Sequence, residues 1–273
     1  MSDRPARPPR PQHVLHVVGT ERLTPHLVRV RAQGQDLAAF RESPHTDTYV
    51  KITFAKPELG LEPPYDLAAL RETLAPEDLP VTRTYTVRAV EGDLLVIDFV
   101  VHGDEGLAGP WAARAQPGDR LVVSSPGGGY APDPSAAWHL FIGDESAIPA
   151  IAAALEALSP DAVGAAFLEV QAADEQLALT APAGVAITWV HRGGATAGAT
   201  NVLSDAVASW HPLPGRGHVF AHGEREAMKR MRDVVFAQWG LGREQVSLSG
   251  YWAYGRTEDR FQAEKREPIG QIL

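Results

Sequence analysis

The hexapeptide Arg83-Thr84-Tyr85-Thr86-Val87-Arg88 lies inside Val81–Ala89, a run with the composition of a β-strand. Five other short β-type runs surround it, separated by Gly and Pro residues: His13–Val18, Leu27–Ala32, Tyr49–Phe54, Leu94–Val101 and Arg120–Ser124. Several short strands with frequent turns predict a small antiparallel barrel or sandwich in the N-terminal part.

Beyond residue 135 the pattern changes to strands that alternate with helices. Strands are expected at Trp138–Ile142, Gly164–Val170, Val185–His191, His218–Ala221 and Gln245–Tyr251, and helices at Ala147–Leu158, Asn201–Trp210 and Arg225–Trp239. Such alternation predicts βαβ units and a parallel sheet. We therefore expect an N-terminal antiparallel β-barrel domain over 12–134 and a C-terminal α/β domain over 135–273. Residues 1–11 are rich in Pro and Arg and are expected to form a disordered leader.

Composition excludes several classes of protein. The 273 residues include 25 Lys plus Arg and 34 Asp plus Glu, so the formal net charge is −9, which disfavours sequence-independent binding of nucleic acid. No apolar run is long enough for a membrane span, and we expect a cytoplasmic protein. There is no cysteine, which excludes disulfides, cysteine-ligated iron–sulfur clusters and a thiol nucleophile. Redox chemistry would therefore need an organic cofactor or a metal with other ligands.

Alternation along the hexapeptide places Arg83 and Tyr85 on one side of the strand and Thr84 and Thr86 on the other. A guanidinium pairs with phosphate, and a phenol packs against a planar ring, so this pair suits a phosphorylated aromatic ligand. The alternative is an ordinary strand with an exposed arginine and a half-buried tyrosine.

Two further stretches lie at turns where phosphate or nucleotide is often bound. Residues 102–112 (HGDEGLAGPWA) follow a strand and precede a short helix expected at Pro110–Ala115, so free amide groups there suit a pyrophosphate. Gly143–Ala150 (GDESAIPA) lies at the first βα turn of the second domain, where open α/β sheets bind ligands. Either stretch is also compatible with an ordinary glycine-rich connection, and neither contains GxGxxG or a P-loop.

In this order the three stretches resemble the siderophore-interacting protein family of flavin-dependent ferric reductases, within the ferredoxin-reductase-like superfamily. The resemblance covers roughly His13 to Gly255. Further matches are 98–103 (DFVVHG), 113–119 (ARAQPGD), 126–128 (PGG), 189–192 (WVHR), 222–224 (HGE) and 250–252 (GYW).

The resemblance implies FAD in the barrel domain and NADH or NADPH at the α/β domain. It assigns cofactor binding to Arg83, Tyr85, Thr86, His102, Gly106, Ala108, Trp111, Ala112, Asp144, Glu145, Ala147 and Pro149. Thr86 is the implied contact to flavin N5 and so the one catalytic candidate. The family usually reads GPASRWA where this chain reads Gly106–Ala112 (GLAGPWA), so the serine hydroxyl is replaced by Gly109.

The donor and the substrate are less defined. Some family members take electrons from a ferredoxin, and the acidic segment 171–175 (QAADE) favours NADH over NADPH. Lys51 matches a position that holds anionic ferric siderophores, whereas the family's frequent YWR is here 251–253 (YWA). Lys51 is equally compatible with a solvent-facing strand lysine.

We therefore expect an FAD-dependent reductase of ferric siderophores or other ferric chelates. A flavin-loaded carrier or sensor of a ferric complex, and a flavin oxidoreductase with another acceptor, remain alternatives. No resident metal is expected, because the ten histidines form no cluster with ligand-like spacing. Thr257–Glu267 is expected to form a short amphipathic helix without an assigned role.

Overall fold

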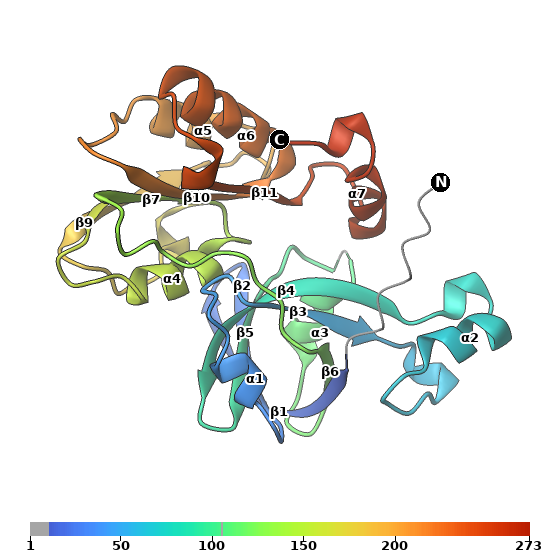
Figure 1. Cartoon of the computed structure of the whole chain (residues 1–273). Helices are drawn as coiled ribbons and strands as arrows, with labels where there is room; N and C mark the ends of the chain where they lie inside the picture. Colours follow the sequence, from blue (N-terminus) through green and yellow to red (C-terminus); the bar gives the residue numbers. More distant parts are fainter. Residues whose placement is uncertain (1–10, 105) are drawn as a thin grey trace, which may run out of the picture.

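The N-terminal half of the protein is a closed antiparallel barrel (Figure 1). The computed structural model describes residues 11–104 and 106–273, so the predicted leader lies outside the described residues except for Pro11. The barrel strands are β1 (Gln12–Thr24), β2 (Leu27–Gln33), β3 (Tyr49–Phe54), β4 (Val81–Glu91), β5 (Leu94–Val100) and β6 (Arg120–Ser124). They close in the order β1-β2-β5-β4-β3-β6. The predicted barrel is confirmed.

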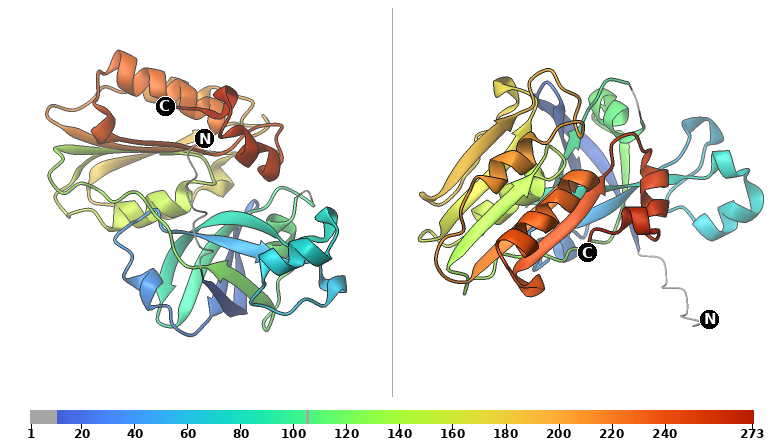
Figure 2. Two further views of the ribbon diagram at one scale, coloured as in Figure 1. Left: turned by 45° about the vertical axis from the view of Figure 1, so that its right-hand side comes forward. Right: turned by 90° about the horizontal axis from the view of Figure 1, so that it is seen from above.

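Alternation of apolar residues explains the barrel core. Leu95, Ile97 and Phe99 of β5 point inward together with Leu15 and Ile52, and none is more than 1% exposed. Short helices α1 (Ala38–Arg41) and α3 (Ala108–Arg114) attach to the barrel. The long connection between β3 and β4 projects from its side in both views of Figure 2. That connection contains η1 (Pro57–Leu59), α2 (Leu67–Thr73) and η2 (Pro76–Asp78).

The C-terminal half is a five-stranded parallel sheet with helices on both faces. Its strands are β7 (Trp138–Gly143), β8 (Val163–Val170), β9 (Gly184–His191), β10 (Gly217–Glu224) and β11 (Val246–Trp252), in the order β11-β10-β7-β8-β9. Helix α4 (Ile148–Glu156) covers the face toward the barrel, whereas α5 (Val202–Ala208) and α6 (Arg225–Arg232) cover the opposite face (Figure 1). The predicted α/β domain is confirmed.

Two details differ from expectation. The helix predicted over 225–239 ends as an α-helix at Arg232 and continues as a π-helical segment, η4 (Asp233–Gln238). The helix expected at Asn201–Trp210 is α5, which begins at Val202, and Asn201 at its N-cap position makes no side-chain capping hydrogen bond.

The remaining elements are η3 (Ala173–Glu175), η5 (Arg243–Gln245), α7 (Glu258–Glu264) and η6 (Pro268–Gly270). Within the described residues, no helix combines the length and apolar character that a bilayer span requires.

The two halves contact each other through polar side chains and through α4, which packs against β4. Arg88 of β4 forms a two-pronged ion pair with Glu156 at the end of α4, with Nη1 3.0 Å from Oε2. Thr24 Oγ1, at the end of β1, donates a 2.5 Å hydrogen bond to Glu175 of η3. The segment 125–137 links β6 to β7. The domain boundary after residue 134 stays a prediction.

Candidate functional site

Strand β4 brings its Arg-Thr-Tyr-Thr segment to the contact between the two halves. The Tyr85 ring is 4.4 Å from the Phe99 ring, and burial raises the pKa of Tyr85 well above its usual range. Thr86 is 7% exposed and hydrogen bonds to Tyr251, at the end of β11. This bond crosses from barrel to sheet and places the Thr86 hydroxyl at the domain contact. Sequence reasoning missed Tyr251 as a site residue.

Arg83 contacts a segment that the sequence left without a role. Its guanidinium pairs with Asp259 of α7, with Nη1–Oδ1 3.0 Å and Nη2–Oδ2 3.2 Å. The arginine side chain is 18% exposed, whereas Asp259 is 69% exposed. The pair therefore lies at the surface, where it is weak, and Arg83 remains available to another anion.

The loop after β5 has the backbone expected of an anion-binding turn. Gly103 and Gly106 have φ angles of +60° and +80°, and apart from their chain neighbours no atom of the described residues lies within 4 Å of where a Cβ would stand on either residue. Left-handed backbone of this kind turns amide groups toward one side, and the missing glycine Cβ leaves room for close approach. Both features fit a pyrophosphate.

The helix after this loop starts at Ala108, two residues before the predicted Pro110. A Cβ on Gly109 would lie 2.9 Å from the Val100 carbonyl oxygen, so the helix packs directly on the end of β5. In this chain a side chain at position 109 would therefore require the helix or the end of β5 to shift. Ala108 and Ala112 are buried, so only their backbone can face a ligand, and Trp111 packs between Phe54 and Phe99 at 5.7 and 5.6 Å.

Asp144 ties three strand ends together. Oδ1 accepts hydrogen bonds from the amide and the hydroxyl of Ser146, at 3.0 and 2.5 Å. Oδ2 accepts from the Glu224 amide and from Trp252 Nε1, both at 2.8 Å. Burial and the nearby Glu145 nevertheless raise the Asp144 pKa. The carboxylate holds the ends of β7, β10 and β11 in one place.

Glu145 takes part in a second buried cluster at the other side of β7. Arg192, after β9, forms a bidentate pair with Glu145 at 2.6 and 2.9 Å, and its Nη1 lies 3.4 Å from Glu169 Oε1 at the end of β8. The Arg192 side chain is 2% exposed. Burial, with the charges of Asp144 and Glu145, raises the pKa of Glu169 to about 7. Charged residues at successive strand ends were the signal that could have revealed this cluster.

His102 faces both clusters from the barrel. Burial lowers its pKa, with further lowering from His26 and Arg192. The His26 and His102 rings are 6.0 Å apart, and His26 Nδ1 pairs with Glu175. The barrel loop therefore meets the carboxyl edge of the sheet through a chain of titratable groups.

Two predicted residues lie apart from these clusters. Ala147 is fully buried at the N-terminus of α4, against Gly143. Pro149 lines an approximately 220 Å³ cavity on the barrel side of α4, together with Arg29 and Arg88. Neither side chain is brought to the Thr86–Tyr251 contact, and the assigned roles of all the cofactor-binding residues stay predictions.

Lys51 is exposed on β3 opposite Thr84, and its charge lowers the pKa of Lys265 after α7. Burial is the larger cause of that lowering, and Glu258 opposes it. Lys265 Nζ lies 4.7 Å above the Phe261 ring, which orients the ammonium. The fold thus brings two cations from distant parts of the chain near each other.

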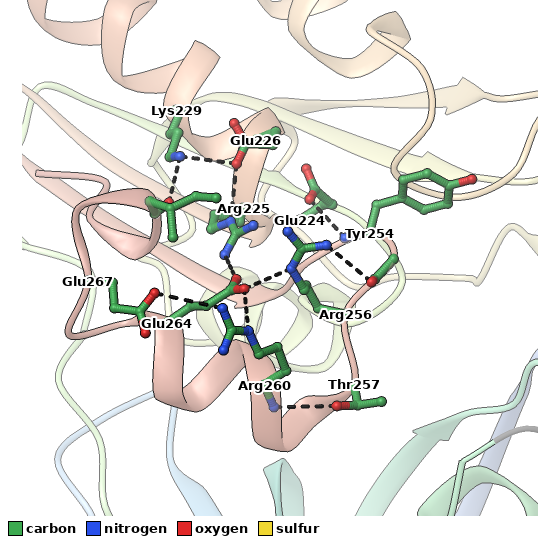
Figure 3. Close-up of polar contacts among 12 residues, drawn as sticks. Glu224, Arg225, Glu226, Lys229, Tyr254, Arg256, Thr257, Arg260, Glu264 and Glu267 are labelled. Carbon is green, nitrogen blue, oxygen red and sulfur yellow. Dashed lines mark hydrogen bonds and ion pairs between the residues drawn. The ribbon is translucent and has the colours of Figure 1, made fainter.

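A hub of arginines around Glu264 anchors α7 (Figure 3). Arg225 Nη1 donates to Glu264 at 2.5 Å, and the Nε atoms of Arg256 and Arg260 donate at 2.8 Å. These bonds lower the Glu264 pKa to about 2, the bond from Arg225 contributing most. The helix predicted over Thr257–Glu267 forms over Glu258–Glu264 only, and the Thr257 hydroxyl caps it by accepting from the Arg260 amide.

The buried histidines have ring partners. His222 stacks on Phe220 at 3.8 Å, its Nε2 lies 2.9 Å from Ser247 Oγ, and burial lowers its pKa to about 3. His218 stacks on Tyr130 at 4.9 Å. Within residues 11–104 and 106–273, no group of three or more His, Asp or Glu side chains is arranged to hold a metal ion.

A closed barrel that presents such a strand to the carboxyl edge of a parallel sheet has the ferredoxin-reductase-like architecture. The chain belongs to the siderophore-interacting protein family. The family's siderophore-interacting FAD-binding domain matches residues 16–130, and its siderophore-interacting protein domain matches residues 136–255.

Relatives and solved structures agree with this assignment. The ferric vibriobactin reductase ViuB of Vibrio cholerae is 33% identical over 264 residues, which cover 92% of this chain and 93% of ViuB. An NADPH-dependent ferric-chelate reductase of Escherichia coli is 34% identical over 171 residues, covering 60% of this chain and 65% of that protein. A siderophore utilization protein from T. fusca is 39% identical with a TM-score of 0.78, covering 91% of this chain and 95% of that one.

The barrel is therefore an FAD-binding domain, and its residues fit that cofactor. Gly103 and Gly106 leave the loop open to close approach, and Arg83 supplies a cation at the same end of β4 as the half-buried Tyr85 ring. The Thr86 hydroxyl lies where the sheet meets the barrel. Phosphate, ring and hydroxyl partners are thus all present.

The titration of Glu169 yields a test of the buried cluster. The unfolded chain releases this proton near pH 4.5, whereas the folded protein retains it to about pH 7. The folded state therefore binds more protons in that window, so the free energy of unfolding falls as pH rises through it, by about 3 kcal/mol in full. Glu169→Gln should remove this contribution, as measured by urea unfolding of both proteins across the window.

The matched control is Asp161→Asn, an exposed carboxylate in the turn that precedes β8. It should keep the pH dependence of the wild type. Parallel pH profiles for wild type and Glu169→Gln would contradict the shifted Glu169 pKa.

Proposed function

We propose that this protein catalyses the NAD(P)H-dependent reduction of ferric siderophores or other ferric chelates, with FAD bound in the barrel domain. One NAD(P)H provides two electrons for two Fe(III) complexes, and the iron leaves as Fe(II). The Thr86–Tyr251 contact carries the proposal. It joins β4, the strand with the proposed flavin ligands, to the carboxyl edge of the parallel sheet, where sheets of this kind bind a nucleotide. The activities named for the Vibrio and Escherichia relatives support it.

Each part of the barrel site has a proposed task. Arg83 binds an FAD phosphate, Tyr85 lies along the flavin ring, and the Thr86 hydroxyl hydrogen bonds to N5. His102 and the backbone of residues 106–112 hold the pyrophosphate. With Arg83 and Thr86 in these roles, the reactive edge of the flavin would lie at the domain contact, where Thr86 is 7% exposed.

The chemistry supplied by bound FAD is the conversion of a two-electron donor into single electrons for Fe(III). Asp144 and Glu145 shape the turn that faces the nicotinamide. Iron release follows because Fe(II), less charged and softer, is held less tightly by oxygen-donor chelators. Ferredoxin remains an alternative donor. We assign the reaction to the cytoplasm, because it consumes a nicotinamide nucleotide and the chain has no cysteine for the disulfides common in secreted proteins.

The test is an anaerobic visible spectrum of the FAD-loaded protein before and after addition of NADH or NADPH. The flavin absorbance should bleach with a nicotinamide nucleotide and return on addition of a ferric chelate. A flavin that stays oxidised with both nucleotides would overturn the NAD(P)H reductase and favour a ferredoxin donor or a carrier. Bleaching without reoxidation by any ferric chelate would favour another acceptor.

Arg83→Ala should lower the FAD content of the purified protein, because it removes the proposed phosphate ligand. The control is Asp259→Ala, which breaks the same surface ion pair but leaves the guanidinium in place. It should retain the flavin content of the wild type. The measurement is the ratio of flavin to protein absorbance after gel filtration, and an unchanged ratio in Arg83→Ala would contradict the assignment.

Lys51→Ala and Lys265→Ala should each raise KM for an anionic ferric chelate by about two- to fivefold, since exposed charge pairs contribute little individually. The effect should shrink with added salt. Turnover with a neutral quinone should not change. Lys56→Ala is the matched control, because Lys56 is an exposed lysine of the connection between β3 and β4 and pairs with Asp78. Equal KM changes for quinone and chelate would contradict a role in substrate attraction.

A further inference from the structure

The strand order gives a direction to the donor nucleotide along the sheet edge. Thr86, the proposed flavin contact, bonds to the end of β11, at one side of the order β11-β10-β7-β8-β9. A dinucleotide bound at the carboxyl ends of the strands with its nicotinamide there extends across the β7 turn. Its adenosine ribose then lies over the ends of β8 and β9.

Glu169 and Arg192 occupy those two strand ends. The Arg192 Nη atoms are engaged by Glu145 and Glu169, but its Nε is buried and has no hydrogen-bond partner among the described residues. The arginine side chain is 2% exposed and the glutamate side chain 8%. A donor without an acceptor, beside a carboxylate, is costly unless a further group completes the network.

A ribose hydroxyl is the group that satisfies both partners at once. It accepts from Nε and donates to a carboxylate, as a hydroxyl can do both. A 2′-phosphate has no proton to donate when ionised and brings negative charge toward Glu145 and Glu169. The Arg192 charge is already neutralised by those carboxylates, so it offers little compensation.

We propose that Glu169 and Arg192 bind the adenosine-ribose hydroxyls of the donor, and that the donor is NADH rather than NADPH. This inference rests on the proposed function. The connection 171–183 contains no Lys or Arg, and 191–201 contains only Arg192, so no other cation in these segments can hold a 2′-phosphate. Because the Arg192 side chain is 2% exposed, binding of the ribose requires the groups that cover Nε to shift.

The test measures binding of ADP-ribose and of 2′-phospho-ADP-ribose to the FAD-loaded protein by calorimetry, alongside kcat/KM for NADH and NADPH, all at a pH well above 7 so that Glu169 is ionised. The wild type should bind ADP-ribose at least about tenfold more tightly than the 2′-phosphate form, with the same preference in kcat/KM. Glu169→Gln should weaken the binding of ADP-ribose and reduce the preference for ADP-ribose over its 2′-phosphate form. The substitution removes the carboxylate that accepts from the ribose hydroxyl and repels phosphate. Asp161→Asn, which removes an exposed carboxylate in the turn before β8, should retain the wild-type ratio.

The wild-type ratio tests the inference even if the Glu169 variant does not fold. Equal or tighter binding of the 2′-phosphate form, together with turnover of NADPH, would overturn the inference and leave the reductase intact. A preserved preference in folded Glu169→Gln would overturn the role of Glu169. Absence of flavin reduction by either nucleotide would instead overturn the proposed function.

Discussion

The buried carboxylate of Asp144 is the constraint on which the site depends. Its oxygens accept from Ser146, Glu224 and Trp252, so one side chain fixes the carboxyl ends of β7, β10 and β11. Four hydrogen bonds offset the desolvation of the carboxylate, which burial alone would strongly disfavour. Loss of this group would release the β11 end, and with it Tyr251, from the barrel strand that carries Thr86.

Arg192 performs the corresponding task on the other side of β7. The guanidinium joins Glu145 of the β7 turn to Glu169 of β8. Charged side chains therefore connect β7 to its neighbouring strands on both sides. A buried pair of this kind contributes to geometry more than to stability, because the desolvation cost is large. The sheet edge is therefore a rigid surface whose shape is set by polar groups.

The two domains could be predicted because their signals are local. Alternation in Tyr49–Phe54 located β3 at the same residues, and the Gly143 turn was found from its place after an apolar run. Trp252, by contrast, bonds to Asp144 from 108 positions away, and no periodicity indicates such a partner. The Gly109 replacement was visible in the sequence, but the close approach of its backbone to Val100 needed coordinates.

The C-terminal helix illustrates how distant charge completes the substrate side. The buried residues of α7 are Phe261 and Glu264. Because Phe261 is the single large apolar side chain among them, attachment of the helix depends mainly on the hydrogen bonds between Glu264 and its three arginines. Those guanidinium groups keep Glu264 ionised at neutral pH, which makes the attachment electrostatic and specific in position. The helix thereby carries Lys265 to the vicinity of Lys51, so the positive charge near the barrel rim depends on a segment whose sequence alone assigns it no role.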